Sequence, residues 1–195
     1  MKTLARFKLI REIVRHRSGH GAPHDQHAIK LAWIDYFRNV CGLNVMVETG
    51  TYHGQTVEAM LRRFKCIYTI ELSPDLWEMA NEKFERFSHV HVMRGNSADV
   101  LPKVINEITE RCLFWLDGHF SGVGTARGPM DSPIVGELAA IRRHALKNHV
   151  ILIDDARLFN GTNGYMTLQE AFCILKEINA RYTVRVKDDM IQAYC

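Results

Sequence analysis

Two acidic residues and two glycines carry the first chemical signal in this sequence. Glu48 precedes Gly50 and Gly54 in the segment Glu48-Thr-Gly-Thr-Tyr-His-Gly54, where an apolar run gives way to a polar one. Glycine at such a turn lets the backbone approach a ligand closely. The same pattern is about as often a simple turn, so its interpretation depends on the residues that follow.

Glu71 ends the next apolar run, about 20 residues beyond the glycines. A carboxylate at this place can accept hydrogen bonds from both ribose hydroxyls of an adenosine, as in nucleotide dehydrogenases and in methyltransferases. Glu48 distinguishes the two, because a carboxylate beside the turn repels a pyrophosphate but attracts the ammonium group of a methionine moiety. The sequence therefore predicts an S-adenosylmethionine site, with Thr51 and Tyr52 of the same turn beside the ligand.

A third polar turn, Gly95-Asn-Ser-Ala-Asp99, follows another apolar run. Asn96 and Ser97 would lie near the adenine amino group if this turn shares the sheet edge with the other two. A turn without a ligand is nearly as good an interpretation.

Three further carboxylates, Asp117, Asp154 and Asp155, end two more apolar runs. Packed together they would repel one another unless a cation joined them. Oxygen ligands suit Mg²⁺, so a magnesium site on these three residues is one prediction. Arg157, two residues further on, is expected to be solvated.

A methyl acceptor that is a hydroxyl needs a base, and two residues are candidates. An imidazole ordinarily titrates near neutral pH, and His119 follows Asp117 by two positions. A solvated or locally bonded histidine is an equally good interpretation of His119, and Asp117 is the competing base if no metal binds.

Short apolar runs alternate with amphipathic stretches from residue 44 onward, which is typical of a doubly wound α/β fold with a mainly parallel sheet. The expected strands are Val45–Glu48, Cys66–Glu71, Val90–Arg94, Leu113–Asp117 and Val150–Asp154, and a C-terminal antiparallel hairpin of Tyr182–Val186 and Met190–Tyr194 completes seven strands. The expected helices are Gln55–Phe64, Pro74–Phe87, Leu101–Thr109, Pro133–Leu146 and Leu168–Ala180, with Ser73 and Ser132 as N-caps before prolines.

Residues 1–40 stand outside this alternation and are expected to form an N-terminal helical extension or lid on a domain of residues 41–195. Their first helix is basic and amphipathic, with Leu4, Phe7 and Ile10 at helical spacing. Packing on the domain or on a second copy of the chain is the favoured interpretation, and peripheral membrane contact is the alternative.

The bulk composition excludes few classes of protein. A formal net charge of +3 over 195 residues gives no clear nucleic-acid signal. The 5 scattered cysteines indicate a reducing, cytoplasmic setting. No apolar run approaches the ~20 residues that span a bilayer, so no transmembrane segment is expected.

Residues 44–195 resemble class I S-adenosylmethionine-dependent methyltransferases. The matching motifs, in order, are Glu48-Thr-Gly-Thr-Tyr-His-Gly54, Ile70-Glu71, Gly95-Asn-Ser97, Phe114-Trp-Leu-Asp-Gly-His119 and Ile151-Leu-Ile-Asp-Asp155. Within the class the chain most resembles macrocin-type and FkbM-like O-methyltransferases, which act on sugars and natural products. That narrower resemblance implies a divalent metal on Asp117, Asp154 and Asp155, although many FkbM-like relatives are not known to need one.

The sequence therefore predicts methyl transfer from S-adenosylmethionine to a hydroxyl of a small molecule, a sugar or glycoside, with or without Mg²⁺. The competing hypotheses are a methyltransferase for RNA or protein, a nucleotide-dependent oxidoreductase, and a non-catalytic S-adenosylmethionine-binding module.

Overall fold

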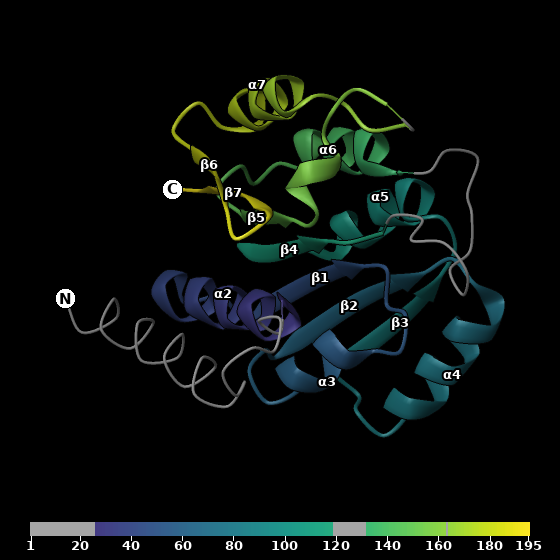
Figure 1. Cartoon of the computed structure of the whole chain (residues 1–195). Coiled ribbons are helices and arrows are strands. Elements are labelled where there is room, and N and C mark those ends of the chain that lie inside the picture. Colours follow the sequence, from purple (N-terminus) through teal and green to yellow (C-terminus); the bar gives the residue numbers. More distant parts are fainter. Residues whose placement is uncertain (1–25, 119–131, 163) are drawn as a thin grey trace, which may run out of the picture.

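The computed structural model describes residues 26–118, 132–162 and 164–195, and its seven strands form one sheet in the order β3-β2-β1-β4-β5-β7-β6 (Figure 1). The strands are β1 (Val45–Thr49), β2 (Cys66–Glu71), β3 (Val90–Arg94), β4 (Cys112–Leu116), β5 (Val150–Ile153), β6 (Thr183–Lys187) and β7 (Met190–Tyr194). The first five are parallel, and β7 runs antiparallel to β5 and β6. This confirms the predicted doubly wound fold with a reversed hairpin. The strand order reverses between β1 and β4, which is where open α/β sheets bind ligands.

Helices cover both faces of the sheet (Figure 1). One face carries α2 (Gln26–Cys41), α3 (Gln55–Met60) and α4 (Pro74–Phe84), and the other carries α5 (Ser97–Glu107), α6 (Ile134–Arg143) and α7 (Leu168–Ile178). Alternate residues of each strand therefore enter different cores: Phe114 packs with α5 to α7, and its neighbour Trp115 packs with α2 to α4. Burial on both faces explains why the strands read as nearly continuous apolar runs.

Helix α2 belongs to the body of the domain. Trp33, Ile34 and Phe37 are buried in the core that it shares with α3 and α4. The boundary that the sequence suggests after residue 40 falls inside this helix, and the basic amphipathic helix expected before it lies outside the described residues. No helix of the described ranges is both long and apolar enough to cross a bilayer.

The helix starts follow local hydrogen bonding. The Ser73 hydroxyl caps α4 by accepting from the Leu76 amide, with Pro74 at the first helical position, as predicted. Ser132 is a correction: the N-cap of α6 is Pro133, and Ser132 instead accepts a 3.4 Å hydrogen bond from the Ile134 amide. Helix α5 begins at Ser97, four residues before its predicted start, because the polar turn itself caps it.

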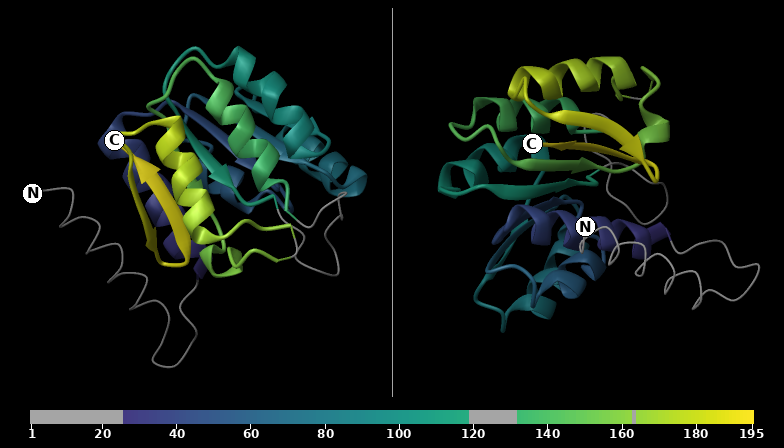
Figure 2. Two further views of the ribbon diagram at one scale, coloured as in Figure 1. Left: turned by 90° about the horizontal axis from the view of Figure 1, so that it is seen from above. Right: turned by 90° about the vertical axis from the view of Figure 1, so that its left-hand side faces the viewer.

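The C-terminal hairpin stands at one edge of the sheet, as the two views of Figure 2 show. Its loop is Asp188-Asp189, with φ of 50° and 59°, which matches the two-residue turn that suits twisted strands. The Trp33 indole donates a 2.8 Å hydrogen bond to Asp188, and the Arg185 guanidinium lies 5.4 Å from the centre of the Trp33 ring. The hairpin is thereby fastened to helix α2.

Candidate functional site

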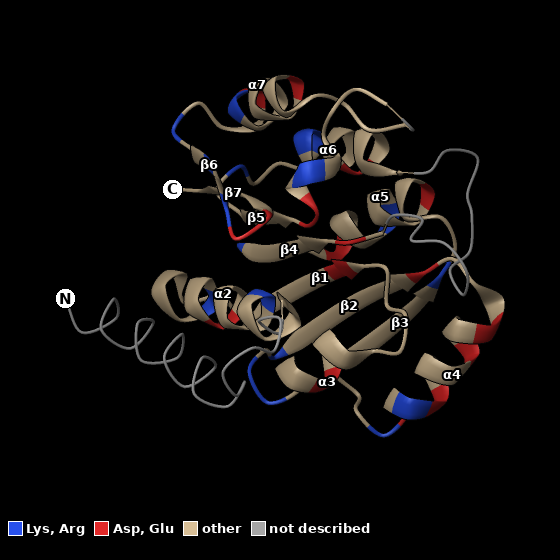
Figure 3. Ribbon diagram, in the orientation of Figure 1, with Lys and Arg blue, Asp and Glu red and all other residues tan. Residues whose placement is uncertain are grey.

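The carboxyl ends of the central strands are held side by side by backbone hydrogen bonds. The Gly50 amide donates to Ile70 O at 2.9 Å, the Asp117 amide to Thr49 O at 3.1 Å, and the Asp154 amide to Leu116 O at 3.0 Å. The residues that follow β1, β2, β4 and β5 therefore share one edge of the sheet. Figure 3 shows acidic positions, in red, along this edge.

Gly50 marks a close approach between the turn after β1 and the end of β4. Its φ is +81°, and a Cβ atom built on it would lie 2.5 Å from the Asp117 carbonyl oxygen. Gly54 has φ of +70° and a built Cβ 2.6 Å from the Phe84 ring. Tyr52, between them, adopts φ of 50° without being glycine and is 45% exposed. Such backbone outliers cluster at ligand-binding turns.

Glu71 ties this turn to the end of β2. One carboxylate oxygen accepts a 2.8 Å hydrogen bond from the Tyr52 amide, and the other accepts one of 2.8 Å from the Ser73 amide. Each oxygen retains a second lone pair that a ribose hydroxyl can use. The residue thus lies where the sequence predicts a ribose partner, and its contact with a ligand stays a prediction.

Glu48 is an interior residue, with 1% of its surface exposed. The Thr69 hydroxyl donates to its carboxyl at 2.6 Å, and Thr51 lies 2.6 Å from Thr69 between their hydroxyl oxygens. Burial raises the pKa of Glu48 to about 8, although its hydrogen bonds with Thr69 and Thr56 lower it. Without a ligand the carboxyl is therefore mainly neutral at pH 7. This position favours a structural role for Glu48, in which it holds Thr51 in place through Thr69. A direct ionic contact with an ammonium group stays a prediction.

Asn96 and Ser97 both use their side chains within the fold. The Asn96 carbonyl caps α5 by accepting from the Ala98 amide at 3.0 Å. The Ser97 hydroxyl donates to Glu137 of α6 at 2.5 Å, and Glu137 is buried. The Gly95 amide donates to Glu71 O at 2.8 Å, so the turn lies at the predicted edge, and its contact with the adenine stays a prediction.

A lysine enters the acidic cluster after β4 and β5, which the sequence interpretation missed. Lys30 of α2 forms a salt bridge with Asp154 and lies 3.9 Å from an oxygen of Asp155. Burial lowers the pKa of Lys30, but the hydrogen bond with Asp154 and the charges of Asp154, Asp117 and Asp155 outweigh it and raise the pKa overall. One signal was present: Lys30 falls on the apolar stripe of its helix.

Asp117 is the third acid of this cluster and is half-buried. Burial raises its pKa well above the ordinary value, and the negative charge of Asp154 and a hydrogen bond between the two carboxyls raise it further. The Lys30 charge opposes these effects. Asp117 therefore binds a proton more tightly than an ordinary carboxyl does.

Asp155 turns toward the C-terminal hairpin. Its φ is 52°, and it lies 2.8 Å from Arg157, which also pairs with Asp189 in the hairpin loop. The Arg157 amide donates to Asp189 at 3.0 Å. Arg157, expected to be solvated, is about half exposed but joins the acidic loop to the hairpin.

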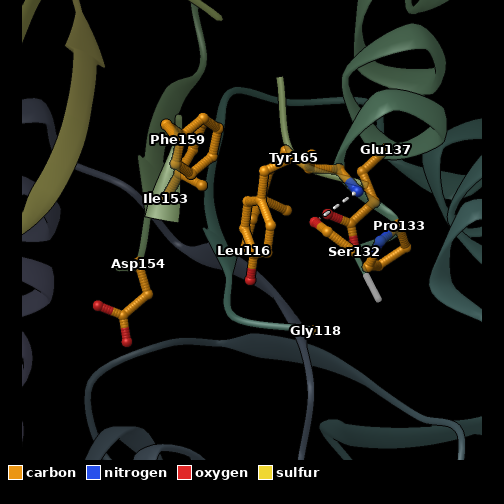
Figure 4. A pocket seen from close by; sticks show the side chains of 10 residues that line it. Leu116, Gly118, Ser132, Pro133, Glu137, Ile153, Asp154, Phe159 and Tyr165 are labelled. Atoms are coloured by element: carbon orange, nitrogen blue, oxygen red, sulfur yellow. Dashed lines mark hydrogen bonds between the residues drawn. The ribbon is translucent and has the colours of Figure 1, made fainter. Parts of the chain in front are cut away.

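A pocket opens between the ends of β4 and β5 and the start of α6 (Figure 4). Figure 4 shows the Tyr165 ring reaching between Asp154 on one side and Ser132 and Glu137 on the other. Burial raises the pKa of Tyr165, so its phenol stays protonated. The pocket is lined by Leu116, Gly118, Ser132, Pro133, Ile134, Glu137, Ile153, Asp154, Phe159 and Tyr165. Tyr165 and Glu137 carried no signal in the sequence that connected them with this edge.

The predicted metal ligands do not fit a divalent ion as they lie. Among the described residues, no three His, Cys, Asp or Glu side chains are arranged to hold a metal. One Asp154 oxygen accepts from Lys30 and the other from the Asp155 amide, while Asp155 pairs with Arg157. His119, the second candidate base, lies outside the described residues.

Comparison with known proteins identifies the fold. No family model matches the sequence, and no curated protein matches it. Among solved structures, an O-methyltransferase from Bacillus cereus in complex with S-adenosylhomocysteine matches with a TM-score of 0.59 and 14% identity over 100% of this chain and 91% of the other. The S-adenosylhomocysteine-bound methyltransferase PaMTH1 of Podospora anserina matches with a TM-score of 0.57 and 16% identity, covering 98% and 86%.

A third structure with this fold contains a metal. The methyltransferase MycE of the mycinamycin biosynthetic pathway, in complex with Mg, S-adenosylhomocysteine and mycinamycin VI, matches with a TM-score of 0.55 and 14% identity over 83% of this chain and 48% of the other. At these identities the likeness establishes a shared fold, the class I methyltransferase fold.

Proposed function

We propose that this chain is an S-adenosylmethionine-dependent methyltransferase that acts on a hydroxyl of a small molecule, a sugar or glycoside. The observation that carries the proposal is the joint placement of Gly50 and Glu71. Gly50 lies too close to the end of β4 to carry a side chain, and its turn lies beside the Glu71 carboxylate at the end of β2. Solved structures with the same fold hold S-adenosylhomocysteine.

The cofactor end uses the turn after β1 and the neighbouring strand ends. Glu71 accepts hydrogen bonds from the ribose hydroxyls, and the backbone of Gly50 to Gly54 contacts the methionine portion. The Asn96-Ser97 turn faces the adenine. S-adenosylmethionine, when bound, supplies a methyl group on a sulfonium that is reactive toward an aligned hydroxyl oxygen.

The acceptor end uses the residues after β4 and β5. Asp117 accepts the proton that the acceptor hydroxyl loses as its oxygen becomes bonded to the methyl carbon and the carbon–sulfur bond breaks. A carboxyl whose pKa lies above the ordinary range is a stronger base than an ordinary one. His119 is the alternative base. Ser132 and Tyr165, which line the small pocket beside Asp154, offer hydroxyl groups to a polyhydroxylated acceptor at this end of the sheet.

The cofactor is tested by isothermal titration of the full chain with S-adenosylmethionine, S-adenosylhomocysteine and NAD. We expect saturable binding of both sulfur nucleotides and none of NAD. Glu71→Ala should weaken binding at least about tenfold, because it removes a charge-assisted acceptor worth about 1.5 to 3 kcal/mol.

The matched control is Glu58→Ala, which removes an exposed carboxylate of α3 that pairs with Lys83 at 2.8 Å. This variant should bind like the wild type. Preference for NAD, or equal loss in the two variants, would contradict the proposal. A different result is that the chain binds S-adenosylmethionine but forms no S-adenosylhomocysteine with any hydroxyl acceptor of a sugar panel. That result would favour a non-catalytic module.

A further inference from the structure

Lys30 is a charged residue on a buried helix face. It precedes Trp33, Ile34 and Phe37 by three, four and seven positions, so it shares the stripe that packs on the sheet. Its side chain is 16% exposed. A charge in such a place is costly unless it is paired.

The partner is remote in sequence. Lys30 and Asp154 are 124 positions apart and meet where β5 ends, and the Asp154 side chain is 2% exposed. Asp155 lies 3.9 Å from the same ammonium, and the negative charge of Asp117 also acts on it. The three carboxylates that the sequence assigns to a metal thus have a cation within the chain.

We propose that Lys30 is the resident cation at the acceptor end of this site, in the place where a divalent metal would bind. It compensates part of the negative charge of the acids after β4 and β5 and keeps Asp154 in position. A consequence that rests on the proposed function is that methyl transfer here needs no divalent metal.

Lys30 and a divalent metal exclude each other for two reasons. Mg²⁺ needs carboxylate oxygens about 2.0 to 2.1 Å away, and the Asp154 oxygens are occupied by Lys30 and by the Asp155 amide. An ammonium group within the same cluster would also repel the metal ion. A structural neighbour, MycE, is complexed with Mg, so the fold itself permits a metal.

The test is a Mn²⁺ titration of the full chain followed by electron paramagnetic resonance, after removal of metals with EDTA. The wild type should show no saturable binding up to about 1 mM Mn²⁺, the weak end of protein sites for divalent ions. Lys30→Met keeps an unbranched side chain, one atom shorter than that of lysine, and removes the charge. It should gain one saturable site, and the Lys30→Met/Asp154→Asn double variant should lose that site again.

Arg63→Ala is the matched control. The change breaks a 3.0 Å ion pair between Arg63 and Asp35. Asp35 lies on α2, like Lys30, but away from the acidic cluster, so this variant should gain no Mn²⁺ site. Saturable Mn²⁺ binding by the wild type that Asp154→Asn abolishes would overturn the proposal, and so would a Lys30→Met variant that gains no site. If Lys30→Met fails to fold, the wild type and Asp154→Asn still give the first of these answers.

The two proposals fail separately. Absence of S-adenosylmethionine binding with the expected Mn²⁺ results would reject the methyltransferase function and support Lys30 as the resident cation. Normal S-adenosylmethionine binding together with a saturable Mn²⁺ site in the wild type would reject Lys30 as the resident cation and support the methyltransferase function.

Discussion

Glu48 and Glu71 lie at neighbouring strand ends in very different surroundings. The two Glu71 oxygens each accept a hydrogen bond from a backbone amide. The Glu48 carboxyl meets hydroxyl groups in the interior, and burial raises its pKa to about 8. The same residue type thus offers an acceptor to a ligand in one case and a neutral structural group in the other.

The raised pKa of Glu48 makes stability fall as the pH rises. The folded chain keeps this proton up to a pH of about 8, whereas the unfolded chain releases it near the ordinary value of 4.5. The contribution is therefore complete below pH 4.5 and is lost as the pH rises through about 8. In urea unfolding, the free energy of unfolding of Glu48→Gln should rise relative to that of the wild type as the pH increases across this range. The limiting slope of the difference is about 1.4 kcal/mol per pH unit.

The control for this series is Glu58→Gln, whose carboxylate is exposed. Its free energy of unfolding should run parallel to that of the wild type. A Glu48→Gln curve that is also parallel would show that Glu48 is not buried as a neutral acid.

At the scale of elements, the site depends on how closely the turn after β1 approaches the end of β4. Gly50 combines a positive φ with a built Cβ 2.5 Å from the Asp117 carbonyl oxygen, while Gly42 has φ of +64° and nothing within 4 Å of such an atom. Alanine at the two positions therefore separates backbone strain from loss of the close approach.

We expect Gly42→Ala to lower the free energy of unfolding by about 1 kcal/mol and to leave S-adenosylmethionine binding unchanged. Gly50→Ala should cost a further ~1 to 3 kcal/mol, because the methyl group forces β4 away from the turn. Its cofactor affinity should fall with it. Thermal unfolding and calorimetry on both variants measure these effects, and equal losses would mean that the approach to β4 is unimportant.

Helix α2 and the hairpin are further elements that shape the acceptor end. Helix α2 supplies Lys30, and the hairpin loop supplies Asp189 to Arg157. The Trp33–Asp188 hydrogen bond joins α2 to the hairpin. The acidic loop after β5 is thus held between two segments from opposite ends of the described chain.

At the scale of the whole molecule, the two edges of the sheet differ. The carboxyl edge of the parallel strands carries the candidate site. At the opposite edge, the buried His149 and the half-buried His144 lie 2.8 Å apart between ring nitrogens. The other ring nitrogen of His149 accepts a 3.2 Å hydrogen bond from the Cys112 amide. Burial is the main cause that lowers the pKa of His149 to about 4, from 6.5.

This histidine links global stability to acid pH. As the pH falls, His149 takes up a proton near pH 6.5 in the unfolded chain but only near pH 4 in the folded chain. Its contribution is therefore present above pH 6.5 and is lost as the pH falls through about 4, to a total of about 3 kcal/mol.

Urea unfolding between pH 7.5 and pH 4.5 should show a shallower acid slope for His149→Gln than for the wild type. His91→Gln, which changes an exposed histidine, should keep the wild-type slope. An unchanged slope in His149→Gln would contradict the burial of a neutral imidazole.

Local patterns in the sequence determined the alternation of strands and helices, the reversed hairpin, and the strand ends at which Gly50, Glu71, Asp117 and Asp154 lie. They could do so because hydrophobic periodicity and turn residues act over a few neighbouring positions. Helix limits were less predictable from hydrophobic periodicity, because a polar cap such as Asn96 starts helix α5 before its apolar residues begin.

Only the tertiary structure decided which charges meet and which carboxyls are buried. The salt bridge between Lys30 and Asp154 spans 124 positions, and Glu48 is mainly neutral at pH 7 because burial in the core raises its pKa to about 8. Charge interactions and desolvation depend on distances in space and on burial. The sequence therefore placed acids at one edge of the sheet, whereas the fold determined that a lysine lies among them.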